Sequence, residues 1–266
     1  MQKFPLFLLL TVAVGLPISS YGHQAAGQAS HGREAAEQPA AAYAPQTAAP
    51  QTAATWKEGP PVAARFGVSV SRDGSRPVVQ GDWYLLRDLQ RIERVRPDAG
   101  LAEIWERDDR GEVSLKRVFS NDARIVEYVP GELRARQMEL PWESLGSVVD
   151  PKFFATLKRT RTVNTRYGKA SVWRGSIAGE RIELWWLDAL ALPARVIKQQ
   201  QKARVTVNLK TLHFATPKIW PRADMMEGRI FETIDVADLG DRHYDPFVHK
   251  VESLDAVLQG IASPRK

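Results

Sequence analysis

An acidic, histidine-containing stretch near the C-terminus has residue types suited to binding a cation. Asp241, His243, Asp245 and His249 lie in one short, polar segment. Carboxylates and imidazoles supply the oxygen and nitrogen ligands that divalent cations take. The spacing lacks the glycine and the terminal glutamate of an EF-hand loop. The stretch is a candidate metal site, and the competing interpretation is capping and turn chemistry around Gly240.

No familiar catalytic arrangement of residues occurs in the sequence. It contains no Gly-x-Ser-x-Gly elbow, phosphate-binding loop, His-Glu-x-x-His motif or dinucleotide fingerprint. Cysteine is absent from the whole chain, which excludes thiolate metal sites, cysteine nucleophiles and disulfides. We therefore expect a non-enzymatic protein without a cofactor.

Tryptophan is the second residue type of interest, and the chain has eight. Inward-facing indoles on a curved sheet can line an apolar hollow that holds an acyl chain. The expected lining joins three tryptophans to a short apolar stripe: Trp173, Trp185, Trp186, Phe153, Phe154 and Leu157. Adjacent residues of a strand point to opposite faces, so the pattern leaves open which of Trp185 and Trp186 faces inward. The competing interpretation is that these side chains simply fill the core of a large sheet.

The elements that carry these tryptophans are predicted as strands over residues 168–216. Ile182 and Leu184 alternate there with Arg181 and Glu183. A period of two over a whole segment is typical of a strand with one apolar and one polar face. The breaks between segments are too short for a crossover helix, so we expect neighbouring strands to pair antiparallel.

A second series of short strands is predicted earlier in the chain, at 66–70, 83–87, 90–95, 101–107, 112–119 and 123–129. Between the two series the period changes. Asp150-Pro151 is a helix-start pattern, and Phe153, Phe154 and Leu157 follow it as an apolar stripe. A short helix is also expected at 251–260. The sequence therefore predicts a mainly β (α+β) fold, a strongly curved antiparallel sheet with short helices covering its concave face.

Residues 1–22 have the pattern of a secretory signal peptide. Lys3 precedes an apolar run from Phe4 to Ile18, and small residues lie before an expected cleavage position near Gly22. An uncleaved membrane anchor is the alternative, although the run is short for a span. Residues 23–58 are rich in Ala, Gln and Pro without an apolar period, which predicts a disordered tether. Export without any cysteine favours a bacterial periplasm.

The charge of the chain is a mild excess, +6 at pH 7. Arginines of the first series, such as Arg87, Arg91 and Arg94, are interleaved with acidic residues such as Glu93 and Glu103. This pattern favours a solvated outer face with cross-strand ion pairs. Together with export, it argues against nucleic acid as a partner.

The order of these segments is similar to that of the periplasmic lipoprotein carriers of the Lol system, the LolA/LolB-like superfamily, in particular its uncharacterised lipoprotein-sorting-like branch. The similarity rests on Val172-Trp173-Arg174-Gly175, on residues 179–185 and on Leu192-Pro193-Ala194-Arg195-Val196. It implies that the curved antiparallel sheet is an incomplete β-barrel, a half-barrel over residues 59–215 whose hollow, lidded by helices, holds lipoprotein acyl chains. Residues 216–266 would then be a C-terminal extension with a short helix.

Two functions follow from these observations. The resemblance implies a non-enzymatic periplasmic protein, peripheral to the membrane at most, that binds a lipid or lipoprotein acyl chain or another apolar ligand in the hollow. The alternative is an envelope interaction or sensor module, in which the C-terminal Asp/His segment binds an envelope protein or a metal ion.

Overall fold

The computed structural model describes residues 58–72, 74–149, 154, 156–177, 179–223 and 230–262, and these all belong to one compact unit. The predicted signal peptide, nearly all of the predicted tether, the Asp150-Pro151 helix start and Phe153 lie outside the described residues. Among the residues that are described, none of the helices has both the length and the apolar character needed to span a bilayer.

The first series of strands follows the chain closely as predicted. The strands are β1 (Val62–Arg72), β2 (Val78–Arg87), β3 (Arg91–Arg96), β4 (Leu101–Arg107), β5 (Val113–Phe119) and β6 (Arg124–Tyr128). A short 3-10 helix, η2 (Pro97–Ala99), joins β3 to β4. The helices are α1 (Pro130–Ala135) and α2 (Trp142–Leu145). Every strand of this series overlaps a segment that alternation of apolar and polar residues predicts.

The second series and the C-terminal elements complete the fold. Its strands are β7 (Lys158–Thr165), β8 (Gly168–Ile177), β9 (Glu180–Leu187), β10 (Leu192–Gln200) and β11 (Ala203–His213). They are followed by β12 (Glu232–Asp235), the 3-10 helix η4 (Val236–Arg242) and α3 (Pro246–Ala262). The C-terminal helix therefore begins earlier than the predicted residue 251, and β7 is a strand that the sequence pattern did not indicate.

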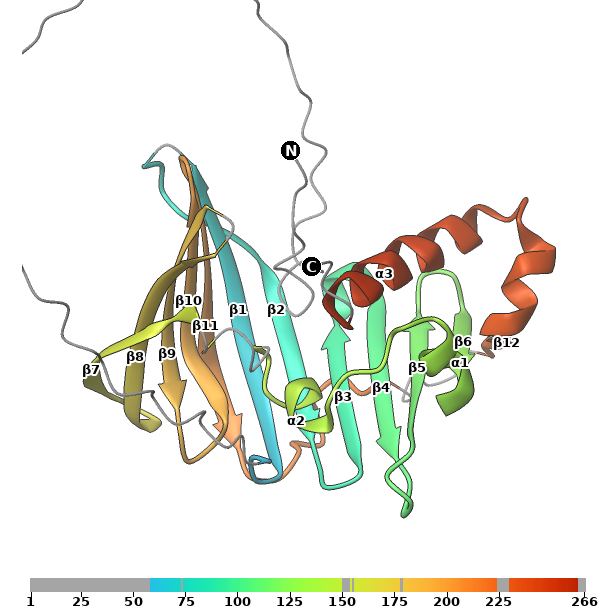
Figure 1. Cartoon of the computed structure of the whole chain (residues 1–266), viewed down its shortest axis with the longest axis horizontal. Helices are drawn as coiled ribbons and strands as arrows, with labels where there is room; N and C mark the ends of the chain where they lie inside the picture. Colours follow the sequence, from blue (N-terminus) through green and yellow to red (C-terminus); the bar gives the residue numbers. More distant parts are fainter. Residues whose placement is uncertain are drawn as a thin grey trace, which may run out of the picture. The chain divides into compact units, whose positions relative to one another are not determined.

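The twelve strands of the described residues form one sheet in the order β12-β6-β5-β4-β3-β2-β1-β11-β10-β9-β8-β7 (Figure 1). The two series join because β1 pairs with β11, from Ala63 opposite His213 to Arg72 opposite Ala203. Neighbouring strands are antiparallel, except that β12 runs parallel to β6. The outermost strands β12 and β7 do not pair with each other, so the sheet is open. The predicted mainly β fold with an open, curved sheet is confirmed.

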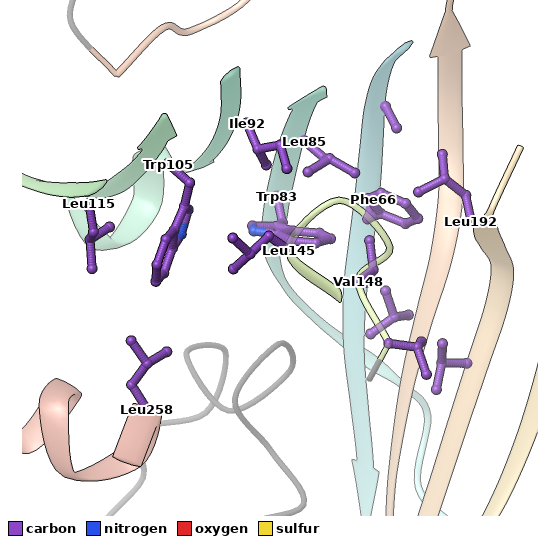
Figure 2. Packing of buried hydrophobic residues seen from close by; sticks show 14 of the residues in the cluster. Phe66, Trp83, Leu85, Ile92, Trp105, Leu115, Leu145, Val148, Leu192 and Leu258 are labelled. Atoms are coloured by element: carbon purple, nitrogen blue, oxygen red, sulfur yellow. The ribbon is translucent and has the colours of Figure 1, made fainter. Parts of the chain in front are cut away.

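The helices cover one face of this sheet. Leu145 of α2 and Leu258 of α3 belong to the same buried cluster as Phe66 and Trp105 of the strands. Figure 2 shows Leu258 directed toward Trp105 and Leu145 lying beside Trp83. Most members of this buried cluster come from the strands.

The prediction of an exposed arginine face was wrong for Arg87 and Arg94, whose relative exposures are 7% and 5%. Arg87 lies opposite Ile92, and Ile92 lies opposite Trp105. Directly opposed residues of antiparallel strands point to the same side, so Arg87 shares the helix-covered face with Trp105. Arg94, two residues after Ile92, points to this face as well. Arg91 behaves as predicted, because it pairs with Glu106 at 2.6 Å.

Candidate ligand-binding face

The register of the strands defines a single continuous face under the helices, which we call the concave face. Phe66 of β1 lies opposite Trp83 of β2 on one side and opposite Leu209 of β11 on the other. The same face continues from Val207, two residues from Leu209, through Val196 to Leu184. It ends on β8, where Trp173 lies opposite Leu184: the full set is Phe66, Trp83, Leu209, Val207, Val196, Leu184 and Trp173.

Three of the predicted lining residues meet on this face near the β7 end of the sheet. The ring of Phe154 lies 5.0 Å from the ring of Trp173 and 5.0 Å from that of Trp186, with interplanar angles of 75° and 73°. Edge-to-face pairs of this kind contribute about 0.5–1.5 kcal/mol each beyond the area that they bury. The Phe154 ring therefore packs against both indole rings.

A glycine lets the chain cross directly over strand β8 beside these rings. A Cβ at Gly175 would lie 2.8 Å from the Thr156 carbonyl oxygen and 2.8 Å from Leu157 Cδ2. Real Cβ atoms do not approach backbone atoms so closely, so a larger residue at Gly175 would push the crossing segment away from the sheet. Leu157 itself is buried.

Trp185 does not belong to the concave face. It lies opposite Val172 on β8 and opposite Arg195 on β10, which point to the outer side of the sheet. Its Nε1 donates to Glu183 Oε1 at 2.7 Å, and the Arg195 guanidinium lies 5.5 Å from its ring centre. The structure thus separates the adjacent tryptophans, with Trp186 inward and Trp185 outward.

Arg87 holds α2 against the sheet. Its guanidinium donates to the carbonyl oxygens of Pro60 at 3.0 Å, Gly146 at 2.7 Å, Leu190 at 2.6 Å and Ala191 at 3.3 Å. Gly146 ends α2, and a Cβ there would lie 2.6 Å from Arg87 Cδ. Burial lowers the pKa of Arg87 to about 10, against the attraction of nearby Glu58. The side chain is therefore still charged at neutral pH.

A buried polar network joins the sheet to α3. Arg117 Nη1 donates to Asp255 Oδ1 of the helix and to the Tyr128 hydroxyl at 3.2 Å. The same hydroxyl donates to Asp255 Oδ1 at 2.9 Å, and Arg117 Nε donates to Glu103 Oε1 at 3.2 Å. Burial alone would lower the pKa of Arg117, but Tyr128, Glu103 and Asp255 raise it.

The network also reaches α2. Arg94 Nη1 lies 3.5 Å from Glu103 Oε2, and Arg94 Nη2 donates to the carbonyl oxygen of Leu145. Burial lowers the pKa of Arg94 to about 10, while Glu103 favours its charged form. Glu103 is thus shared between Arg94 and Arg117, so one row of charges fixes two covering helices at once.

Sequence reasoning missed these buried charges, although a signal for them exists. Arg87 follows Leu85 by two residues, Arg94 follows Ile92 by two, and Arg117 follows Leu115 by two. Since residues two apart in a strand point to the same face, each arginine occupies an apolar-face position of its strand. An arginine that interrupts the inward row of a strand needs a buried partner. That requirement indicates a covering element with carbonyl or carboxylate groups.

The candidate metal residues are not brought together as a cation site. Asp245 Oδ2 pairs with Arg124 at 2.5 Å, and Asp245 Oδ1 accepts from the Phe247 N–H in the first turn of α3 at 2.9 Å. His249 Nδ1 lies 3.4 Å from Glu252. The described part of the chain contains no group of three or more His, Asp or Glu side chains placed to hold a metal ion. The contacts of Asp245 are those of a capping residue.

The Phe247 N–H and Arg124 hold the pKa of Asp245 below its usual range. The ring of His243 contacts that of its neighbour Tyr244, with ring centres 3.8 Å apart and an interplanar angle of 44°. Asp241, the fourth candidate ligand, lies in η4. A metal or partner site in this segment stays a prediction.

Neither a protein-family model nor a curated protein matches this chain. Similar solved structures include PNGF-II, with 13% identity and a TM-score of 0.39 over 69% of this chain and 33% of that one. The MucA/MucB complex of Pseudomonas aeruginosa shows 15% identity and a TM-score of 0.30 over 58% of this chain and 53% of that one. This chain thus spans a third of the first structure and about half of the second.

A LolA superfamily protein from Nitrosomonas europaea, NE2245, is also similar, with 7% identity and a TM-score of 0.30 over 62% of this chain and 91% of that one. It belongs to the superfamily that the sequence resembles. All three TM-scores lie below 0.5, so the functional proposals below rest on the side chains of this chain.

Proposed function

We propose that this chain is a non-enzymatic periplasmic protein that binds a lipid or lipoprotein acyl chain, or another apolar ligand, on the concave face of its sheet. The observation that carries the proposal is the contact of Phe154 with Trp173 and Trp186. An apolar chain that takes the place of Phe154 meets two indoles. Each Å² of apolar surface that it removes from water contributes about 25 cal/mol.

The cover over this face supports the proposal because its two parts are held differently. At α2, Arg87 and Arg94 bind backbone carbonyl groups. At the other end of the covering segment, Phe154 and Leu157 contribute apolar side chains to the buried cluster. Exchange of the apolar Phe154 and Leu157 side chains for a ligand breaks no side-chain hydrogen bond, whereas removal of α2 would take buried Arg87 and Arg94 away from carbonyl oxygens that they bind. We therefore place the ligand at the Phe154 end.

The sequence pattern of residues 1–22 supports a periplasmic location for this activity, beside membranes that supply acyl chains. An apolar hollow with polar groups at its rim is the usual form of such a site. Ser171 lies opposite Trp186 at this rim, and its hydroxyl donates to Asp188 Oδ2 at 2.7 Å. This pair is the polar group best placed to meet the head of a bound chain.

The test compares two tryptophans of neighbouring strands that point to opposite faces. Binding of a fluorescent 12-carbon fatty acid is titrated in the wild type, in Trp173→Ala and in Trp185→Ala. We expect Trp173→Ala to weaken binding about tenfold, because it removes apolar contact of order 1–2 kcal/mol from the ligand. Trp185→Ala changes the same residue type on the outer face and should leave the affinity within about twofold.

Equal losses in the two variants would contradict the proposed face, and so would stronger binding in Trp173→Ala. A wild type that takes up neither the fatty acid nor a lysophospholipid would contradict the function itself. Circular dichroism of both variants shows whether the sheet is intact, so that a loss of binding is not confused with unfolding.

A further inference from the structure

Positive charge is concentrated in one half of the sheet. From Lys158 to His213, which spans β7 to β11, the sequence has twelve Lys and Arg residues and three acids. This segment therefore has a charge of +9, whereas the whole chain has +6, so the remaining residues together carry −3. The mild overall excess conceals a strong separation of charge.

The three acids of this segment all have partners within it. Glu180 forms a buried ion pair with Lys198. Glu183 accepts from Arg174 Nε at 2.7 Å and from Trp185. Asp188 accepts from Ser171. The segment as a whole still keeps an excess of nine positive charges, which determines its surface potential.

Six of the cations lie on the side of the sheet away from the helices, which we call the basic outer face. Arg204 lies opposite Gln199, Gln199 opposite Arg181, and Arg174 opposite Lys158. Arg161 lies opposite Val172, and both Val172 and Arg195 lie opposite Trp185, so Arg161 and Arg195 point to the same side as Trp185. The basic outer face thus comprises Lys158, Arg161, Arg174, Arg181, Arg195 and Arg204, and all except Arg195 are exposed.

The outer face of the other half differs in two respects. Its cations pair across strands, as Arg91 does with Glu106 at 2.6 Å and Lys116 with Glu127 at 3.0 Å. The connection after β11 also lies on it, because Ala223 packs into an outer cluster with Val95, Ala102, Ile104 and Val118. In Figure 1 the strands β7–β11 lie together on the left. Unbalanced charge is therefore particular to their half.

Protection of a sheet edge explains only part of this pattern. Edge strands commonly carry Lys or Arg that prevent pairing with other chains, and β7 with Lys158 and Arg161 is an outermost strand. Arg181 on β9 and Arg204 on β11, however, belong to strands with partners on both sides. Their charges have no edge to protect.

We propose that the basic outer face docks on an anionic phospholipid membrane. The charges are spread over five strands. A surface of many headgroups can meet such an array without any fixed register, so the array fits a membrane better than it fits a partner that binds as a single strand or in a groove. Val78 and Val79 at the start of β2 are 61% and 75% exposed. Val79 lies opposite Ser69, two residues before Ser71, and Ser71 lies opposite Arg204, so Val79 points to the basic outer face, whereas Val78, opposite Val70, points to the other side. Apolar side chains beside cations are typical of peripheral membrane contacts.

The experiment measures sedimentation of the full chain with vesicles of phosphatidylcholine alone or with 30% phosphatidylglycerol. We expect binding to the anionic vesicles to exceed binding to neutral ones and to fall in 0.5 M NaCl, where charges are screened over a few Å. Arg181→Gln/Arg204→Gln should weaken the anionic preference about fivefold per charge, roughly 25-fold in total. All variants share the same N-terminal segment, so their difference reports the basic outer face.

The matched control is Arg110→Gln/Lys116→Gln, which removes the same net charge from the other half. Equal losses in the two double variants, or no preference for phosphatidylglycerol, would overturn the proposal. A soluble polyglutamate peptide that binds more tightly than vesicles, with the same loss in Arg181→Gln/Arg204→Gln, would assign the face to an acidic protein and overturn it as well. Fatty-acid binding should be unchanged in both double variants, so this test is independent of the acyl-chain site.

Discussion

Glu93 shows how one buried carboxylate can determine the course of a long connection. Its side chain, 2% exposed, accepts from Arg222 Nε at 3.1 and 3.0 Å, from the Ala223 N–H at 3.1 Å and from Arg91 Nε at 2.9 Å. Burial alone would raise the pKa of Glu93, but these donors lower it. Since Arg222 and Ala223 belong to the connection between β11 and β12, the charged carboxylate holds that connection on the sheet.

The contribution of the Glu93 carboxylate to the free energy of unfolding depends on pH in a predictable direction. A carboxyl group whose pKa is lower in the folded state stabilises the fold above its unfolded pKa, near 4.3, and this stabilisation is lost as the pH falls through the folded value. We expect Glu93→Gln to lower the free energy of unfolding by about 2 kcal/mol at pH 7, as for a buried charge pair that keeps part of its hydrogen bonding. Urea unfolding at pH 7, 5 and 3 measures this difference.

The difference between wild type and Glu93→Gln should shrink as the pH falls from 5 to 3. A difference that stays constant over this range would show that the carboxylate charge does not hold the connection. Asp109→Asn, in the exposed β4–β5 turn, is a control of the same charge change and should alter stability by less than about 0.5 kcal/mol.

Among the elements, α3 has a covering face that combines apolar and charged contacts. Val251, Asp255 and Leu258 are separated by four and three residues, so they lie on one stripe of the helix. All three are buried. The apolar residues give the helix its affinity for the sheet, and Asp255 fixes its position, because only one placement meets both Arg117 and Tyr128.

Asp255→Ala should therefore release α3 from the sheet. The substitution leaves Arg117 buried with one fewer anion, which costs about 3–5 kcal/mol in comparable buried pairs. We expect a lower free energy of unfolding in urea and faster hydrogen exchange of the α3 amides. Glu252→Ala, on the exposed side of the same helix, is the control and should change stability by less than about 0.5 kcal/mol. Similar exchange in the two variants would mean that apolar contacts alone hold α3.

Elements with an apolar period were predictable from the sequence, and elements without one were not. Strands β8 to β11 have one buried face, so alternation located them. β7 has polar residues at every position except Val163, so alternation of apolar and polar residues did not indicate it. Helix α1 starts with Pro130-Gly131, a pair that reads as a turn. The pairing of β1 with β11 joins residues far apart in the chain, and no local pattern specifies it.

The candidate site was predictable only where local alternation decides which way a side chain points. Trp173 follows the period of its strand, and the register places it opposite Leu184 on the concave face. For Trp185 and Trp186 the choice depends on the register with β10, where an irregularity lies between Pro193 and Arg195. Phe154 reaches the indoles because the chain crosses β8 at Gly175. Such a crossing depends on tertiary packing and not on the residues near Phe154.

For the whole molecule, β1 is the strand on which both series depend. It pairs with β2 of the first series over Val62 to Val70 and with β11 of the second over Ala63 to Arg72. One buried cluster extends from Tyr128 of β6 to Ala170 of β8. A shared strand and a shared core predict that the two series unfold together, although each has hairpins of its own.

Phe66→Ala tests this coupling because Phe66 lies at the centre of β1. The side chain is fully buried, and its ring lies 5.0 Å from that of Trp83. Removal of a buried phenylalanine side chain lowers the free energy of unfolding by about 3–5 kcal/mol. We expect hydrogen exchange to accelerate together in β4–β5 and in β8–β9, strands that do not contain the substitution. Phe214→Ala, at a side chain that is 70% exposed, should leave both regions protected. Loss of protection in one series alone would mean that the sheet consists of two units that fold separately, and acyl-chain binding near Trp173 would then be independent of the first series.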